Sequence, residues 1–317
     1  MNKLILFFHP GSERDVIKHK DGFCPVPKDR AHTRKYIISR GKILKDNKEE
    51  EKVLGFWGEW EGPSKFTMVR EILKKENHPS ALHHTLIKDY KLEDTDIKVN
   101  TDPLVMGNMF LYSNCQQNYI EDMKTLEPGD ILLFGTGKKS DASKSKRKKI
   151  YDIFICDTVF IVRYRIDNIK TNSKEEFQNS VRGYLKKHKA PKSYVDNFER
   201  LKDWYYNHSI ESLEDNKYSL YIGATYEDSY KGMYSFVPCV EVDLLSHHIG
   251  FERPDISPLL KEMPCFNYVK EGSKGFGNQN VNINTVASGK KTFNSIVEFI
   301  RNQKLEISIA CDFYHEE

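Results

Sequence analysis

The sequence has no apolar run that approaches the ~20 residues of a membrane-spanning helix. Its first apolar run, Leu4 to Phe8, is short, and a His-Pro-Gly turn follows it where a secretory signal would have a small-residue cleavage site. Six cysteines occur without any CxxC pair, which argues against a zinc ribbon. We therefore expect a soluble, cytoplasmic protein with no membrane partner, in which most cysteines are small buried hydrophobes.

Several catalytic signatures are also missing. The chain contains no GxSxG, HExxH, Walker or dinucleotide-binding glycine pattern, which disfavours hydride transfer, P-loop hydrolysis and zinc-protease chemistry. The adjacent pairs His83-His84 and His247-His248 are poor metal sites, because neighbouring side chains on a strand or helix point apart. We expect neither a metal nor a cofactor.

The 317 residues suffice for one large domain or two smaller ones. Short β-branched and aromatic runs predict strands, including one at residues 103–112, and residues 45–52 read as a charged turn. Residues 65–92 are mostly polar, and residues 243–289 are loop-rich. Apolar residues at helical spacing predict two helices between residues 173 and 207, separated at Pro191, and a short amphipathic helix at 291–302. Regular strand–helix alternation is absent, so we predict an α+β fold with a mixed β-sheet or a partly closed barrel. Residues 1–125 would form an N-terminal α/β part, and residues 126–317 a hairpin, a helical insertion and a closing sheet; the alternative is one continuous domain.

Basic charge is concentrated at one predicted hairpin tip. Lysine and arginine total 49 against 46 acidic residues, a net charge of only +3. Residues 138–149, KKSDASKSKRKK, nevertheless hold seven basic residues and one aspartate, between the strands predicted at 131–135 and 151–164. Such a loop suits contact with a nucleic-acid backbone, although surface lysines often serve only solvation. The basic side chains that we assign to this role are Lys146, Arg147, Lys148 and Lys149.

The first candidate site is the end of the N-terminal strand, FFHPGSER. A buried strand that stops at a His-Pro-Gly turn delivers polar side chains to one edge of a sheet. His9 could titrate near neutrality, Ser12 could hold an anion, and Glu13 could act as an acid or base. The alternative is an ordinary turn whose proline and glycine only set backbone angles.

The second and stronger candidate is the segment GFWGEWEGPS. Glu59 and Glu61 lie among aromatic residues, and an apolar wall raises a carboxyl pKa toward the range of a general acid or base. Trp57 or Trp60 could stack a nucleobase, which is worth about 1–3 kcal/mol per base. The alternative is an exposed pair of glutamates on a half-buried aromatic strand.

A third cluster, Arg30 to Lys35, suits a phosphate backbone, and we assign phosphate contacts to Arg34 and Lys35. A solvated basic face is the equally weighted alternative.

Two resemblances add to these patterns. Glu127-Pro128-Gly129-Asp130 and the following Ile131 to Phe134, with the strand 150–163, resemble the hairpin of PUA-like domains of the ASCH and EVE families. That resemblance covers about forty residues and implies a β-barrel that reads modified or flipped bases. Separately, FFHPGSE, His32 to Lys35, GFWGEWEGPS and GMYSFVPC look like a group of bacterial and phage proteins associated with nucleotide modification and antiviral defence. This second resemblance implies action on nucleic acid with unusual bases but transfers no catalytic residue.

The leading hypothesis is a nucleic-acid-directed enzyme, most concretely a DNA glycosylase that hydrolyses the N-glycosidic bond of modified bases in phage DNA. In it, Glu59 or Glu61, or else Glu13, activates water or stabilises the developing sugar cation. DNA is the expected partner rather than RNA. A non-catalytic reader of modified bases or nucleotides is the alternative, and a small-molecule nucleotide hydrolase is the third possibility.

Overall fold

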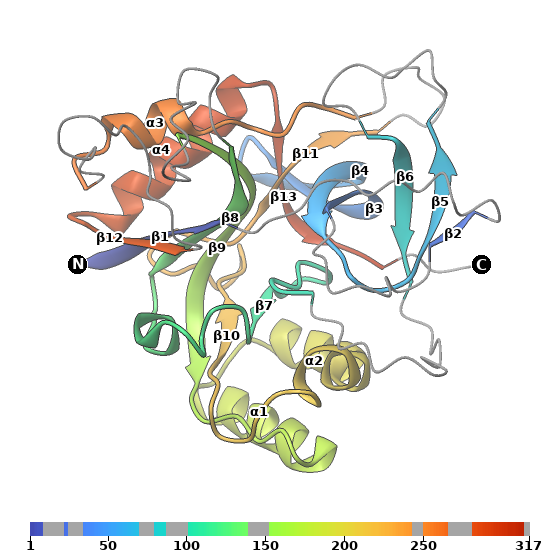
Figure 1. The fold of residues 1–317 in the computed structure, drawn as a ribbon, viewed down its shortest axis with the longest axis vertical. Helices are drawn as coiled ribbons and strands as arrows, with labels where there is room; N and C mark the ends of the chain where they lie inside the picture. The colour runs from blue at the N-terminus through green and yellow to red at the C-terminus, as the bar shows by residue number, and fades with distance from the viewer. Residues whose placement is uncertain are drawn as a thin grey trace, which may run out of the picture.

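The computed structural model describes residues 1–8, 22–24, 34–69, 79–86, 101–138, 152–242, 250–265 and 281–313, and the account below concerns these residues. Two mixed β-sheets lie side by side, with helices packed beside them (Figure 1). The described strands form no closed barrel. The predicted α+β class with a mixed sheet is therefore confirmed.

The first sheet has six strands in the order β12-β1-β8-β9-β10-β7. Only β1 and β8 pair in parallel, and the other neighbours are antiparallel. The bounds of its strands are Asn2–Phe8 for β1, Leu111–Tyr112 for β7, Ile131–Lys138 for β8, Ile153–Ile166 for β9, Leu220–Gly223 for β10 and Val281–Val286 for β12. The predicted hairpin of β8 and β9 is thus present.

The second sheet has seven strands in the order β13-β11-β4-β3-β6-β5-β2, and β13 also pairs with β3. The β3–β6 pair is parallel. The bounds are Phe23–Cys24 for β2, Arg34–Lys45 for β3, Lys48–Glu59 for β4, Ser64–Met68 for β5, Ala81–Thr85 for β6, Val237–Glu241 for β11 and Glu306–Cys311 for β13.

Four α-helices accompany the sheets: α1 (Lys174–Lys187), α2 (Lys192–Tyr205), α3 (Ser257–Glu262) and α4 (Gly289–Asn302). A 3₁₀ turn spans Glu121–Lys124, and a π-helical turn, Tyr206–Ile210, continues α2. Pro191 is the N-cap of α2, as its fixed backbone angle favours, so the predicted break between two helices is confirmed. Ser173 caps α1 by accepting a hydrogen bond from the Glu176 amide.

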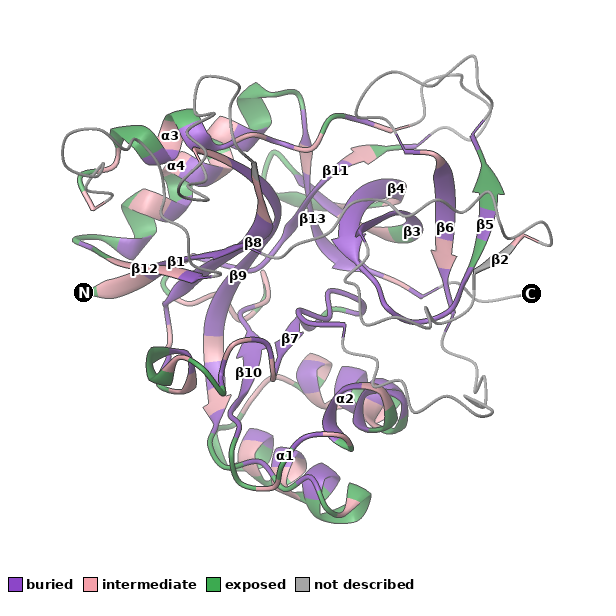
Figure 2. Ribbon diagram, in the orientation of Figure 1, coloured by how far each residue is buried: buried purple, intermediate pink, exposed green. Residues whose placement is uncertain are grey.

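The central strands are buried on both faces, which explains their nearly continuous apolar sequence. In β1, Ile5 and Phe7 belong to a core cluster shared with α1 and α2, whereas Leu4, Leu6 and Phe8 belong to a second cluster shared with α4. Figure 2 shows these strands buried, while the outer faces of the helices are exposed. The two cores continue into the second sheet and join both sheets into one packed unit.

Two predicted segments differ from the structure. Residues 45–52 were expected to form a charged turn, but the turn is only Asp46 and Asn47, both at positive φ, as a two-residue hairpin loop requires. Residues 103–112 were expected to form one strand. Instead the chain reverses through Gly107 (φ 88°), and Leu104 pairs with Leu111. Strands β6 and β12 lie in segments that we had expected to be polar or loop-rich.

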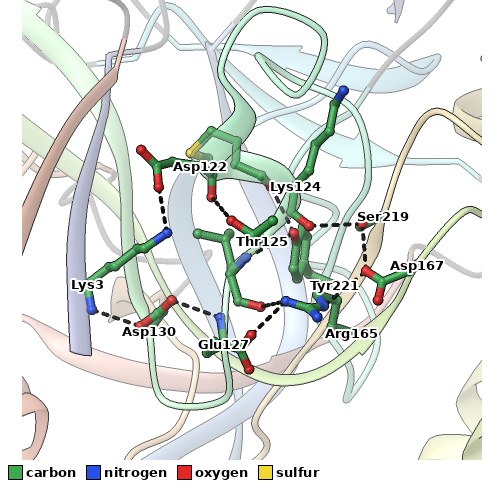
Figure 3. A network of polar contacts seen from close by, with 12 residues as sticks. Lys3, Asp122, Lys124, Thr125, Glu127, Asp130, Arg165, Asp167, Ser219 and Tyr221 are labelled. Carbon is green, nitrogen blue, oxygen red and sulfur yellow. Dashed lines mark hydrogen bonds and ion pairs between the residues drawn. The ribbon is translucent and has the colours of Figure 1, made fainter. Parts of the chain in front are cut away.

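The Glu-Pro-Gly-Asp turn has a structural role (Figure 3). Asp130 accepts hydrogen bonds of 2.8 Å from the backbone amides of Lys3 and Glu127, which fastens the start of β1 to the start of β8. Arg165 on β9 contacts the Glu127 carboxylate at 2.8 Å. These contacts account for the motif without any ligand, so in the described structure it is a fold determinant.

Close packing between β8 and β9 gives the first prediction. A Cβ atom at Gly135 would overlap the backbone oxygen of Ile155, whereas one at Gly183, exposed on α1, would meet nothing within 4 Å. We expect Gly135→Ala to lower the free energy of unfolding by about 1–3 kcal/mol through overpacking. Gly183→Ala, the matched control, should raise it by about 1 kcal/mol because alanine is the better helix former. Denaturant unfolding measures both, and equal effects would contradict this account of the hairpin.

Candidate functional site

Arg34 and Glu59 face each other where the β3–β4 hairpin ends. They are direct partners in the strand register, and their side chains are only 2% and 1% exposed. The Arg34 Nη1 atom lies 3.4 Å from the Glu59 Oε2 atom. Because β3 and β4 run in register from the turn at residues 46–47, backbone pairing fixes this contact between two charged groups inside the protein.

Asp157 on β9 and Arg253 bring two more charges to the same place. The Asp157 carboxylate lies 3.0 Å from Arg34 Nε and accepts two hydrogen bonds, of 2.7 and 2.5 Å, from Arg253. Arg253 also donates to the Thr136 hydroxyl on β8 at 2.8 Å. We call Arg34, Glu59, Asp157 and Arg253 the arginine–carboxylate cluster. It joins the two sheets.

Burial makes the arginine–carboxylate cluster electrostatically costly. Removal of charges from water is compensated only if every charged group finds good partners. Burial lowers the pKa of Arg34 to about 10, against the opposing effect of the Asp157 charge, so Arg34 stays protonated at neutral pH. The Arg34 Nε contact with Asp157 falls short of hydrogen-bond geometry, and its Nη2 group has no hydrogen-bond partner among the described residues. A buried donor left without an acceptor is typical of sites that bind a ligand or water.

The surroundings of the cluster connect it with two predicted features. Strand β1 ends at Phe8, which pairs with Gly135, the neighbour of Thr136. The described part of the β8–β9 hairpin ends where Lys138 pairs with Ile153, only two residues beyond Thr136. The cluster therefore lies beside the point where the N-terminal strand stops, and at the base of the hairpin whose connecting residues carry the basic run.

Both tryptophans of the second candidate segment lie in the core. Trp60 is fully buried, its Nε1 donates to the Pro63 carbonyl at 3.0 Å, and its ring stacks on Trp204 with centroids 5.3 Å apart. Trp57 is 5% exposed and donates to the Phe251 carbonyl at 3.0 Å. The base-stacking role that we predicted for them does not fit this placement, because neither indole presents a ring face to solvent.

The predicted phosphate contacts of Arg34 and Lys35 need the same correction. Arg34 belongs to the buried cluster, and Lys35, 4% exposed, donates to the Gly62 carbonyl at 3.1 Å and to the Ser64 hydroxyl at 3.3 Å. Burial removes both cations from the reach of a DNA backbone at the surface. Trp57 and Trp60 enter the two different core clusters, because side chains three positions apart on an extended chain point to opposite faces.

Glu61 lies near a second buried carboxyl, that of Asp102. Its backbone amide contacts the Thr101 hydroxyl at 3.1 Å, and its charge raises the pKa of Asp102. Asp102 accepts hydrogen bonds of 2.8–2.9 Å from the backbone amides of Ser113, Asn114 and Cys115, which holds that loop in place. The structure thus separates the roles of Glu59 and Glu61, which we had treated as equivalent.

The remaining predicted site residues lie outside the described residues: His9, Ser12, Glu13, Lys146, Arg147, Lys148 and Lys149. Sequence reasoning missed Asp157 and Arg253. A signal for Asp157 exists, since it is the single charged residue within the apolar run IFICDTVFIV. The sequence holds no comparable signal for Arg253, because the residues before it lack the hydrophobic periodicity of a strand or a helix.

Comparison of the chain with protein-family models, with curated proteins and with solved structures gives no match. Among the described residues, no helix has both the length and the apolar character to cross a bilayer. In the same part of the chain, no three His, Cys, Asp or Glu side chains gather as metal ligands would.

The Asp102 carboxyl gives the second prediction. Burial raises its pKa from 3.8 to about 6, with a further contribution from the Glu61 charge. The folded protein therefore holds a proton that the unfolded chain has lost between about pH 4 and pH 6, so stability falls as the pH rises through this window. The shift corresponds to about 3 kcal/mol. Asp102→Asn should flatten this dependence in unfolding measurements, whereas the exposed control Glu121→Gln should not; an unchanged slope in Asp102→Asn would contradict the assignment.

Proposed function

We propose that the protein is a nucleic-acid-directed hydrolase, and that the arginine–carboxylate cluster is its active site. The most concrete form of this proposal is a glycosylase that cleaves the N-glycosidic bond of a modified base in DNA. One observation carries the proposal: two carboxylates and the Arg34 guanidinium are buried together, beside the partly exposed Arg253, where both sheets meet at the base of the basic hairpin. A purely structural core would favour apolar residues at such a position.

The two carboxylates contact the arginines differently. Asp157 is held by two short hydrogen bonds from Arg253 and by the nearby Arg34 Nε. The Glu59 contact with Arg34 is longer, at 3.4 Å, and therefore weaker. We assign Glu59 as the anion that stabilises the positive sugar formed when the glycosidic bond breaks, a role known for carboxylates in glycoside hydrolysis. Asp157 then acts as a positioning residue for both arginines.

The Arg34 Nη2 group is the second part of the proposed site, as a hydrogen-bond donor to the substrate. Its two N–H bonds have no acceptor among the described residues, and at a pKa of about 10 the guanidinium stays charged at neutral pH, with the Asp157 charge opposing the effect of burial. A substrate oxygen on the base or the sugar would satisfy this donor and place the reacting bond next to Glu59. A buried, preorganised donor of this kind contributes most where water is excluded.

The basic hairpin supports nucleic acid as the substrate class. Seven of residues 138–149 are lysine or arginine, and the strands that carry this segment also carry Thr136 and Asp157. With a rise of about 3.3 Å per strand residue, Thr136 lies roughly 7 Å from the position of Lys138. Phosphate contacts by the segment would thus bring a nucleic-acid backbone near the cluster without reading its sequence.

The third prediction tests the catalytic assignment. Glu59→Gln should lower the rate of base release from modified phage DNA by about 10²-fold or more, because the amide cannot stabilise a cation. Its DNA affinity should stay within a few-fold. Heating the DNA in alkali reveals the abasic sites. Glu49→Gln is the control, since Glu49 is an exposed glutamate on the same strand.

Three outcomes separate the alternatives. Wild-type turnover by a folded Glu59→Gln variant would remove Glu59 from the mechanism. A gel shift on modified DNA without cleavage by the wild-type protein would contradict the enzyme and favour a reader. Cleavage of free nucleotides but not of DNA would favour a small-molecule hydrolase. Circular dichroism and thermal unfolding establish that each variant is folded.

The fourth prediction concerns the basic segment. Replacement of four of its cations with glutamine should weaken binding to all DNA sequences alike and reduce the slope of log K against log salt by up to about 4, since each phosphate contact contributes ~0.9. The substitutions are K146Q, R147Q, K148Q and K149Q. The charge-matched control, on exposed lysines elsewhere, is K45Q, K48Q, K217Q and K261Q. Equal slopes for the two quadruple variants would show that the segment makes no specific contribution.

A further inference from the structure

A second buried polar site lies on the opposite face of β3. Lys35 Nζ contacts the Ser64 hydroxyl oxygen at 3.3 Å, and that oxygen lies 2.9 Å from His83 Nδ1. These three side chains come from β3, β5 and β6, and each residue is at most 4% exposed. Successive residues of a strand point to opposite faces, so this site is separate from the one that contains Arg34.

The donors and acceptors that each group offers decide which way the hydrogen bonds run from Lys35 through Ser64 to His83. A lysine ammonium group has donors only, so the Ser64 oxygen accepts from Lys35. The neutral His83 ring could either donate to Ser64 or accept from it, but only acceptance at Nδ1 gives the buried Ser64 hydrogen a partner among the described residues. His83 then carries its proton on Nε2. Burial, together with the Lys35 charge, lowers the pKa of His83 to about 3, so the ring is neutral at physiological pH.

Two polar atoms at the His83 end of this hydrogen-bond chain have no hydrogen-bond partner among the described residues. His83 Nε2 and Thr85 Oγ1 are buried and make no hydrogen bond with any described residue. The residues are 0% and 1% exposed, and they lie two positions apart on β6, on the same face and about 7 Å apart along the strand. Their side chains therefore offer two neighbouring donors, one of them linked through Ser64 to an ammonium charge.

The arrangement does not suit a nucleophilic serine. Attack by Ser64 would transfer its proton to His83, and the same burial and Lys35 charge that keep the ring neutral oppose the imidazolium form. The site is suited instead to donate hydrogen bonds to an oxygen that carries negative charge. Two donors and one nearby cation match a single negative charge better than the two charges of a phosphate.

We propose that His83 Nε2–H and the Thr85 hydroxyl bind the carboxylate group of a small ligand, with Lys35 supplying the favourable charge through Ser64. This binding site is independent of the proposed hydrolase activity. A ligand in this site would supply hydrogen-bond partners to the His83 and Thr85 side chains. On the described part of β6, these are the two residues whose buried polar side-chain atoms lack a hydrogen bond.

The experiment is an NMR titration of the full-length protein labelled with ¹⁵N-histidine, in which the signal lost in His83→Gln identifies the His83 Nε2 resonance. Sodium acetate is added at constant ionic strength, with acetamide and inorganic phosphate as parallel probes. We expect a saturable shift with acetate and weaker effects with the other two. No shift, or equal affinity for acetamide or phosphate, would overturn the carboxylate assignment.

Two variants locate the binding. Thr85→Val removes one donor at constant shape and should weaken acetate binding about tenfold, whereas Thr67→Val, an exposed threonine on β5, should leave it unchanged. Ser64→Ala breaks the chain to Lys35 and should weaken binding with Thr85 intact. Unchanged affinity in Thr85→Val, or in Ser64→Ala if Thr85→Val does not fold, would overturn the proposal.

Discussion

The burial of the central strands on both faces is the constraint on which the rest of the structure depends. Strands β1, β8 and β9 lie between two apolar cores, one shared with α1 and α2 and the other with α4. A polar side chain on such strands has no access to water and must find a partner inside the protein. Asp157, on β9, meets this requirement through Arg34 and Arg253, which belong to other parts of the chain. The charged cluster thus follows from the same packing that defines the fold.

The buried charges also connect the two sheets. Arg34 comes from the second sheet and Asp157 from the first, so their contact couples the two sheets at one point. Removal of one partner would leave an uncompensated charge, which costs far more than the net stabilisation by the pair. The cluster is therefore weak evidence of a net gain in stability.

The sequence was informative where local patterns decide the structure. The apolar runs of β1, β8 and β9, the break at Pro191 and the amphipathic α4 follow from periodicity and backbone preferences, and each is present. The sequence also drew attention to residues 57–61, but it assigned the wrong function to the indoles. Aromatic side chains beside glutamates look alike whether they line a cavity or fill a core, and only tertiary packing against Trp204 and Phe251 distinguishes the two. The partnership of Arg34 with Asp157 spans more than a hundred residues and two sheets, so no local pattern could reveal it.

The hairpin turn at Asp46 and Asn47 has a consequence for how this chain can vary. Twelve cross-strand pairs lead from that turn to the contact between Arg34 and Glu59. Gain or loss of one residue near the turn would shift the alignment of β3 with β4 and send one of the two charged side chains to the opposite face of the sheet. Length changes in this distant, solvent-exposed corner are therefore restricted by an ion pair at the other end of the ribbon, and related chains should keep this loop length even where its residues differ.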